Sequence, residues 1–234
     1  MKITWFGHSG FRFDIGDQVL LVDPWLDGNP VFPADREAEA IAGTTAIFIT
    51  HGHGDHLGDA TRLALATDAA VHAGHEIAEV LDFQGQIKSV GFAKGGTITL
   101  GSVKVSMVPA SHSSSFDMEP GKLGVAGSEC GFMIQGEGHV IYITGDTGIM
   151  ADMGWMGEYY QPDIGILCAG GHYTMDMEMA AWAAKRFFQF KTVIPCHYKT
   201  FGKLAQSADA LVARLPGVDV RVPGVMEPMV WQDG

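Results

Sequence analysis

Three histidines and an aspartate crowd into one short segment of the chain, ITHGHGDHLGD, which begins at Ile49. An apolar run precedes this segment, and a helix-like pattern follows it. His51 and His53 are two positions apart, so they share one face at the end of a strand. Asp55 and His56 begin the helix and approach the same point from the side. Because imidazole and carboxylate groups are common ligands of divalent transition metals, the spacing indicates a metal site at a strand end.

A structural role is the alternative for any one of these histidines. A single histidine is more often a hydrogen-bonded residue of the fold than a metal ligand. Four ligand-type side chains within six residues shift the balance, because such a cluster costs stability unless a cation or a hydrogen-bond network satisfies it. The two glycines between them keep the loop free of bulk. We therefore favour a metal centre.

The composition limits the partners that such a site can serve. The 234 residues carry a net charge of −12 with 15 Lys and Arg, which argues against nucleic acid as a partner. The longest apolar stretches are far shorter than the roughly 20 residues of a membrane span, and the first residues lack the apolar core of a signal peptide. Three cysteines without a CxxC pair suit free thiols in a reducing compartment. We expect a cytoplasmic protein that acts on a small molecule, with no nucleic-acid or membrane partner; a homo-oligomer stays open.

The elements that must position the histidine segment alternate between strands and helices. The chain starts with three strand patterns, KITWFG, FRFDIG and VLLVDPW, which predict an antiparallel beginning. After a helix-like piece at 34–42, strands are expected at 44–50 and 69–74, with helices at 59–67 and 75–83. Two strand pairs follow, at 96–110 with a turn at Gly101 and at 131–145 with a turn at 136–138. The last third alternates again, with strands at 162–171, 192–198 and 218–222 and helices at 175–190 and 206–215.

This order predicts an α/β fold with two sheets flanked by helices. The segment from Ser113 to Gly127, about 15 residues without a regular pattern, has a length typical of functional loops or of disorder. We expect the two halves to join near 113–127 and this loop to cover the pocket and set substrate choice. In the helix at 175–190, apolar residues recur at helical spacing and predict a face packed on the core. These residues are Met179, Trp182, Ala183, Phe187 and Phe190.

The motif HGHGDH matches the HxHxDH signature of the metallo-β-lactamase superfamily, and the chain resembles that superfamily along nearly its whole length. It is most similar to cytoplasmic metal-dependent hydrolases related to ascorbate-6-phosphate lactonase, and more distantly to N-acylphosphatidylethanolamine phospholipase D. The resemblance implies a four-layer αββα sandwich that spans 1–234 as a single domain. The motifs that carry it are TWFGHSGF, LLVDPWL, PASHSSSF, YITGDTG, GGHYTMD and IPCHY, in that order.

The resemblance also implies two neighbouring divalent metal ions. The downstream ligands each stand where an apolar strand gives way to a loop with Gly, Ser or Tyr, as a site along one sheet edge requires. Zn²⁺ is the ion we expect first, and the ligand types also suit Mn²⁺, Ni²⁺ or Fe. The implied ligands are His51, His53 and His112 for one ion and Asp55, His56 and His197 for the other, with Asp146 bridging the two.

Several further residues match positions near the pocket in this family. Asp23 in LLVDPW would orient a ligand histidine from behind, with a strand-end turn before Pro24 as its alternative. His8 in FGHSGF would lie beside the pocket, with a solvated turn histidine as its alternative. The remaining histidines have no matching partners, and we interpret them as structural: they are His72, His75 and His139.

The implied chemistry is hydrolysis by a metal-bridging hydroxide, since two divalent ions lower the pKa of a shared water to roughly 7. Asp55 or Asp146 would hold the proton of the nucleophile. The substrate expected is a small anionic ester, lactone or phosphoester. Ser113 would contact it, with a polar turn as the alternative.

The segment GGHYTMD suggests where an anionic group would bind. Gly170 and Gly171 offer exposed N–H groups, Thr174 would cap the next helix, and the positive end of that helix would face the anion. Against this, Asp176 in the first helical turn would itself offset the helix dipole. Substrate contact, or proton donation to the leaving group, is expected from His172, and substrate contact from Tyr173.

Two other functions fit the same ligands less well. A phosphodiesterase of the phospholipase D or RNA-processing type is disfavoured by the acidic charge. A non-hydrolytic di-metal protein, for redox or binding, is the second alternative, and its di-iron form in this superfamily generally carries a flavin domain. A true β-lactamase is disfavoured because Asp146 stands where many zinc β-lactamases have a cysteine.

Overall fold

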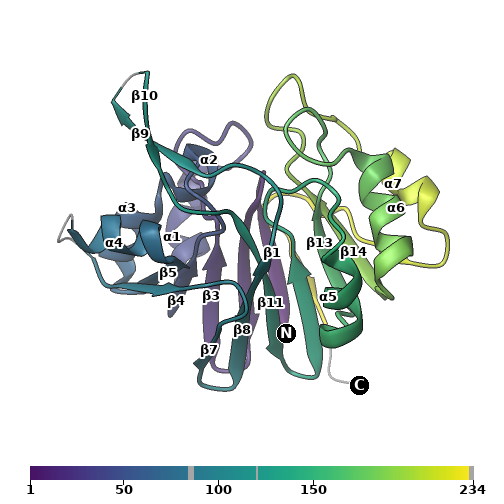
Figure 1. Cartoon of the computed structure of the whole chain (residues 1–234), viewed down its shortest axis with the longest axis horizontal. Helices are drawn as coiled ribbons and strands as arrows, with labels where there is room; N and C mark the ends of the chain where they lie inside the picture. The colour runs from purple at the N-terminus through teal and green to yellow at the C-terminus, as the bar shows by residue number, and fades with distance from the viewer. Residues whose placement is uncertain (84–86, 120, 232–234) are drawn as a thin grey trace.

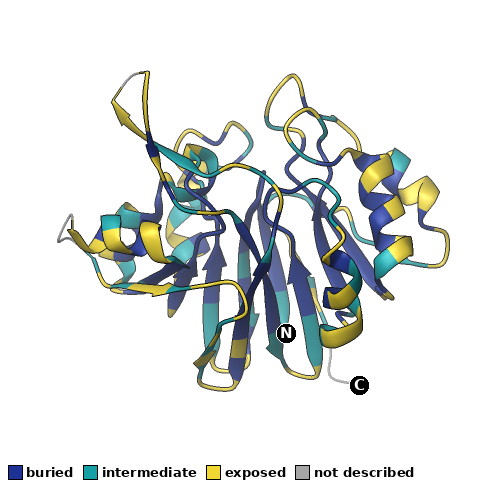
Figure 2. Cartoon of the chain, viewed as in Figure 1, coloured by how far each residue is buried: buried dark blue, intermediate teal, exposed yellow. Residues whose placement is uncertain are grey.

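The computed structural model describes residues 1–83, 87–119 and 121–231. Two seven-stranded sheets lie face to face in the middle of the molecule, and helices cover the outer face of each (Figure 1). The four-layer αββα arrangement expected from the sequence is therefore confirmed. The central strands of the two sheets and the inner faces of the helices are buried, whereas the outer helix faces are exposed (Figure 2).

The first sheet combines an antiparallel start with parallel strands. β1, β2 and β3 are antiparallel neighbours, β4, β5 and β6 continue parallel to β3, and β16 from the end of the chain pairs with β1. Its strands are β16 (Pro228–Val230), β1 (Lys2–Gly7), β2 (Gly10–Ile15), β3 (Gln18–Val22), β4 (Ala46–Phe48), β5 (Ala70–Gly74) and β6 (Ser89–Phe92). The helical segments of this half are η1 (Ala34–Arg36), α1 (Glu37–Ile41), α2 (Gly54–Leu57), α3 (Ala60–Thr67) and α4 (His75–Phe83).

The second sheet repeats this plan. β7, β8, β11 and β12 are antiparallel neighbours, and β13, β14 and β15 continue parallel to β12. Its strands are β15 (Asp219–Val220), β14 (Thr192–Cys196), β13 (Ile164–Cys168), β12 (His139–Ile143), β11 (Cys130–Gly136), β8 (Val103–Pro109) and β7 (Thr97–Leu100). The helices are α5 (Met153–Tyr160), α6 (Met177–Phe187) and α7 (Asp209–Arg214).

The chain passes from the first sheet to the second between β6 and β7, at residues 93–96. The expected junction near 113–127 is therefore wrong. That segment is also not an irregular loop, because it forms the hairpin of β9 (Ser115–Glu119) and β10 (Lys122–Val125). Its sequence, SFDME, alternates apolar and polar residues, which is a strand pattern that charged residues make easy to overlook.

Aromatic residues of the two sheets meet in the central core. The rings of Phe48 on β4 and Phe132 on β11 lie 5.5 Å apart, edge to face. Full burial of side chains of this size contributes about 1.5–3 kcal/mol each, so the inner faces supply much of the stability. A second cluster fills the space between the first sheet and α3 and α4, with Leu63, Ile77 and Leu81 among its members.

Helix α6 differs from its predicted form in its bounds and in its buried face. It begins at Met177 and ends at Phe187, and Asp176 caps it by accepting a hydrogen bond from the N–H of Met179. Thr174 is therefore not the cap. Met179 and Trp182 are 41% and 50% exposed, so they do not form a packed stripe. Small residues let the helix approach the sheet closely, and the buried positions are Met177, Ala180, Ala181, Ala183 and Ala184.

The cysteines, one unexpected helix and the length of the helices can be compared with what the sequence predicted. The cysteines Cys130, Cys168 and Cys196 are buried free thiols. Helix α5 was not expected, because its two glycines lower helix propensity. Within the described ranges, no helix is both long and apolar enough to cross a membrane.

Candidate metal centre

The strand directions bring the predicted ligands to one edge of the sandwich. β1, β3 and β4 run the same way in the first sheet, and β8, β12, β13 and β14 run the same way in the second. Ligand-type residues follow the carboxyl ends of these strands, where side chains of neighbouring strands converge. His8 follows β1, His51 and His53 follow β4, Asp55 and His56 lie in α2, His112 follows β8, Asp146 follows β12, and His197 follows β14.

His51, His53 and His112 form the first group of potential ligands. One nitrogen of each ring lies within 4.8 Å of the others. Nε2 of His51 and Nδ1 of His53 are 2.9 Å apart. His51 is fully buried, whereas His53 and His112 are half-buried, so this group lies at the mouth of the centre. Burial lowers the pKa of all three histidines, which keeps each imidazole neutral, with one unprotonated nitrogen that can bind a cation.

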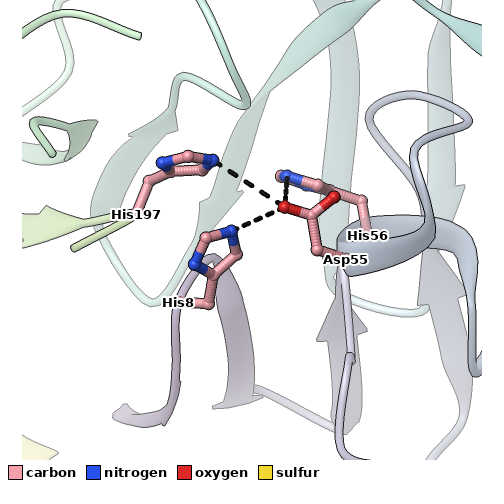
Figure 3. Close-up of side chains that lie close together, drawn as sticks. All are labelled: His8, Asp55, His56 and His197. Atoms are coloured by element: carbon pink, nitrogen blue, oxygen red, sulfur yellow. Dashed lines mark hydrogen bonds and ion pairs between the residues drawn. The ribbon is translucent and has the colours of Figure 1, made fainter. Parts of the chain in front are cut away.

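The second group lies deeper and shares an acidic residue with the first. Ligand atoms of Asp55, His56 and His197 lie within 4.8 Å of one another, together with His8 (Figure 3). Asp146 is buried between the groups. Its Oδ2 lies 3.0 Å from Nε2 of His197 and 3.6 Å from Nε2 of His112, and its Oδ1 lies 3.4 Å from Nε2 of His56.

The charges in the deep group are strongly coupled. Burial favours the uncharged forms, but Asp146, Asp23 and Asp55 together raise the pKa of His56 well above its ordinary value. Burial would likewise raise the pKa of Asp146, yet His56 and His197 hold it well below its ordinary value. The metal-free protein therefore holds a positive imidazolium against a negative carboxylate at neutral pH, a pair that a cation can replace.

Orphaned polar atoms indicate that these residues fit a metal. Among the described residues, Nε2 of His56, Oδ1 of Asp146 and Nδ1 of His197 are buried without a hydrogen-bond partner. Unsatisfied buried polar atoms are rare in folded proteins because each costs about 1–3 kcal/mol. A divalent cation coordinated within the cluster would compensate for much of this cost. Imidazole and carboxylate donors are also the correct ligand set for Zn²⁺ and related ions.

Comparisons with known proteins agree with this geometry. The family described as "Beta-lactamase superfamily domain" matches residues 18–198. A metal-dependent hydrolase named UPF0173 from Paracoccus denitrificans is 60% identical over 229 residues, which cover 98% of this chain and 99% of that protein. A second relative with the same name, from Cereibacter sphaeroides, is 59% identical over the same coverage. The chain is a metal-dependent hydrolase of the metallo-β-lactamase superfamily.

Solved structures support the assignment of the chain to this superfamily. Igni18, a metallo hydrolase from the archaeon Ignicoccus hospitalis, is 32% identical with a TM-score of 0.85, and the match covers 99% of this chain and 98% of that one. An isothiocyanate hydrolase from Delia radicum gut bacteria has a TM-score of 0.77 over the full length of both chains. At 18% identity, the second likeness shows the fold alone. The names of the close relatives favour a hydrolase over the non-hydrolytic alternative.

Asp23 contacts His56 from the side away from the other candidate ligands. Its Oδ2 accepts hydrogen bonds from Nδ1 of His56 at 2.7 Å and from Oγ1 of Thr50 at 2.6 Å. Its Oδ1 accepts the backbone N–H of Thr50 at 2.8 Å. Asp23 keeps one proton of His56 on Nδ1, so a cation that displaces the Nε2 proton meets the lone pair of that nitrogen. Asp23 is fully buried, so a turn role alone does not explain it.

His8 is also fully buried, so the alternative of a solvated turn histidine is wrong. Its Nε2 lies 2.8 Å from Oδ2 of Asp55 (Figure 3). Its Nδ1 lies 2.5 Å from Oγ1 of Thr200. Its ring centroid is 4.1 Å from that of His197. Trp25 and Phe201 cover the same imidazole at 5.2 Å each and form an aromatic wall beside the centre.

The glycine segment after β13 has a steric role, and only one of its two expected N–H groups has a partner within the described backbone. A Cβ on Gly170 would lie 1.8 Å from the backbone oxygen of His197, so only glycine lets these loops touch. The N–H of Gly171 donates to the oxygen of Met175 at 2.9 Å. The anion cradle predicted at this position is therefore not formed by Gly171.

His172 and Tyr173 are exposed, and their rings contact each other at 4.4 Å. Neither residue belongs to the ligand groups found in the described parts of the chain. His172 adopts the left-handed backbone conformation, with φ +60°, which is uncommon outside glycine. Their roles as acid or substrate contact stay predictions.

The β9–β10 hairpin borders the shallow side of the centre. Oγ of Ser114 accepts the N–H of Gly52 at 3.2 Å, and Oγ of Ser113 lies 3.4 Å from Nε2 of His53. A Cβ on Gly52 would lie 2.4 Å from Cβ of Ala126. Gly52 is therefore needed where the end of the hairpin crosses the loop that carries His51 and His53.

The three histidines interpreted as structural lie outside these ligand groups. His72 is buried and stacks on Phe48 at 4.7 Å, and His139 pairs with Asp163 at 2.8 Å. His75 is exposed on α4. Sequence reasoning missed Thr50, Trp25, Thr200 and Phe201, although the last two follow the IPCHY motif after a single lysine.

Proposed function

We propose that the protein hydrolyses a small ester, lactone or phosphoester with two divalent metal ions, Zn²⁺ foremost. The single observation that supports this most is the place of Asp146 between two groups of imidazoles, with one carboxylate oxygen lacking a hydrogen-bond partner among the described residues. The first ion would be held by His51, His53 and His112, and the second by Asp55, His56 and His197, with Asp146 shared.

The metals and the chain contribute different parts of the chemistry. Divalent cations held there would act as Lewis acids and make a water molecule nucleophilic at neutral pH. A carboxylate of the centre would then accept the proton of that water as a general base. Asp146 suits this role, because its Oδ1 is buried beside the ligands without another partner in the described structure. Asp55 is less free, since its Oδ2 already accepts from His8.

The surroundings bear on the size of the substrate. One side of the centre is walled by Trp25 and Phe201, and the other by Ser113 and the hairpin. An aromatic wall on one side and a polar segment on the other favour a compact substrate whose scissile group reaches the ligands between them. We propose that the substrate is anionic, as expected from the sequence, although the N–H of Gly171 would not hold its charge, because it already donates to the oxygen of Met175.

Metal analysis combined with a substrate panel tests this function. We expect the purified protein to contain up to two ions per chain and to hydrolyse members of a panel of lactones, esters and phosphodiesters. Chelation should abolish the rate, and Zn²⁺ or Mn²⁺ should restore it. Asp146→Ala should lose metal and activity, whereas His139→Ala, a histidine outside the centre, should keep both. A chelated, folded sample with the full rate contradicts the proposal.

The hairpin is proposed to set substrate choice. Ser113 and Ser114, which lead into the hairpin, contact the loop of His53, but the hairpin supplies none of the proposed ligands. Shortening the turn between β9 and β10 should change KM across the panel while the metal content stays intact. An unchanged profile would reduce the hairpin to a passive connection.

We also propose a cytoplasmic location and a small molecule as the partner. The three buried free thiols support a reducing compartment. The net charge of −12 supports the absence of a nucleic-acid partner. Fractionation of the producing cells, followed by detection of the protein in each fraction, checks the location.

A further inference from the structure

A chain of hydrogen bonds leads from the loop after β14 into the deep ligand group. Oγ1 of Thr200 lies 2.5 Å from Nδ1 of His8, and Nε2 of His8 lies 2.8 Å from Oδ2 of Asp55. Thr200 is half-buried, and the His8 side chain is fully buried. The contact joins residues 192 positions apart, so only the folded chain creates it.

The chemistry of the three groups fixes the direction of both bonds. An ionised carboxylate can only accept, so Nε2 of His8 must donate its proton to Asp55. A neutral imidazole that carries its proton on Nε2 leaves a lone pair on Nδ1. The hydroxyl of Thr200 therefore donates to Nδ1. Both nitrogens of His8 are then occupied, and neither has a lone pair left for a metal.

The backbone of His8 is held as firmly as its side chain. Its carbonyl oxygen accepts from Nε1 of Trp5 at 2.9 Å and from the backbone N–H of His197 at 2.8 Å. The residue adopts φ +53°, a conformation that costs a non-glycine residue energy and persists where surrounding contacts enforce it. His8 thus ties the proposed ligands Asp55 and His197 to one support.

We propose that Thr200 and His8 are positioning residues that hold the Asp55 carboxylate in the orientation needed to bind the second metal ion. This inference rests on the proposed metal centre. Asp55 is partly exposed, with 24% of its side chain open to solvent, so without this support its carboxylate can rotate away from the cavity. The support acts on the deep site, and it leaves the group of His51, His53 and His112 untouched.

Substitution of Thr200 gives the direct test. Thr200→Val keeps the shape and removes the hydroxyl, whereas Thr200→Ser keeps the hydroxyl. Thr67→Val is the matched control. Thr67 is also half-buried and donates its hydroxyl to the backbone oxygen of Leu63 at 2.7 Å, but it lies in α3, outside the ligand groups. Metal-free proteins are titrated with Zn²⁺ against a chromophoric chelator, which reports the affinity of each site without any substrate.

We expect Thr200→Val to weaken the second Zn²⁺ site by about tenfold, near the lower end of the effect of residues behind metal ligands. The first site should keep its affinity, Thr200→Ser should restore the second, and Thr67→Val should match the wild type. Equal second-site affinity in Thr200→Val and the wild type overturns the inference. A wild type that binds no Zn²⁺ overturns the proposed function instead.

Imidazole nitrogen shifts of the unsubstituted protein provide a second measurement. In ¹⁵N-histidine-labelled, metal-free protein, we expect His8 to carry its proton on Nε2, with Nδ1 accepting a hydrogen bond. A proton on Nδ1 alone would reverse the direction of both bonds and overturn the inference, whatever the stability of the Thr200 variants.

Discussion

Asp23→Asn is the substitution that examines the support of the metal centre most directly. Asn has nearly the shape of Asp, and its amide oxygen can still accept the N–H of Thr50, which now lies 2.8 Å from Oδ1. The amide nitrogen would then take the place of Oδ2, 2.7 Å from Nδ1 of His56. Two donors would face each other there, so His56 is driven to give up its Nδ1 proton and to keep the proton on Nε2. That proton would occupy the position from which His56 binds a cation.

The expected magnitude follows from the bond that is lost. A hydrogen bond to a charged group contributes about 1.5–3 kcal/mol, and the His56 contact is short and fully buried. Loss of a residue behind a metal ligand lowers metal affinity by about 10–100-fold, which corresponds to about 1.4–2.7 kcal/mol. The two figures agree. We expect Asp23→Asn to bind the second Zn²⁺ at least tenfold more weakly and to lose activity in proportion at limiting metal.

Asp163→Asn is a close control for this experiment. Asp163 accepts Nδ1 of His139 at 2.8 Å and the N–H of Val140 at 2.9 Å, the same pair of bonds outside the ligand groups. Chelator competition and rates at limiting Zn²⁺ should separate the two variants. Unaltered affinity in Asp23→Asn, or equal weakening in both variants, would refute the reasoning about the His56 proton.

Three further substitutions address the fold around the centre. Gly170→Ala should cost about 1–3 kcal/mol of unfolding free energy and lower metal affinity, because its Cβ would press on the backbone oxygen of His197. Gly202→Ala, whose Cβ would meet open space, is the control. Thermal melting and chelator competition should show no change in that control. Asp176→Ala should cost about 1 kcal/mol in denaturant unfolding through loss of the α6 cap, with kcat unchanged. Burial lowers the pKa of His72 from 6.5 to about 4, so folding loses stability as pH falls from 6.5 toward 4. Between pH 7.5 and pH 5, the wild type should therefore lose about 2 kcal/mol more than His72→Phe in chemical unfolding of the metal-free proteins.

The seven candidate ligands were implied by the resemblance to the metallo-β-lactamase superfamily, and the strand pattern supported their places. His112, Asp146 and His197 each follow an apolar strand, and strands that share a direction end at the same edge. The strand and helix order could be predicted for the same reason, since apolar periodicity reports burial. The hairpin at β9–β10 escaped because its alternation carries charged residues and it has little apolar surface to bury.

Contacts between distant segments could not be predicted. Nothing in YKTF distinguishes Thr200 from a loop residue, and only the approach of β1 to β14 places it against His8. The cap of α6 shows a related ambiguity, because Thr174 and Asp176 both fit the residue preferences for a cap. The tertiary fold decided between them by tying Met175 to Thr147, which starts the helix later.

The charge distribution around His56 explains how the centre can fold before metal binds. Three carboxylates face this imidazole, so its pKa is raised although burial opposes the charge. Burial lowers the pKa of His51, and the neighbouring histidines lower it further, while Asp146 opposes them. The proton of the metal-free centre therefore lies on His56, where it offsets the charge of Asp146. Binding of a cation must displace this proton, so metal affinity and protonation of the centre are linked, and the same carboxylates that attract the metal stabilise the unloaded fold.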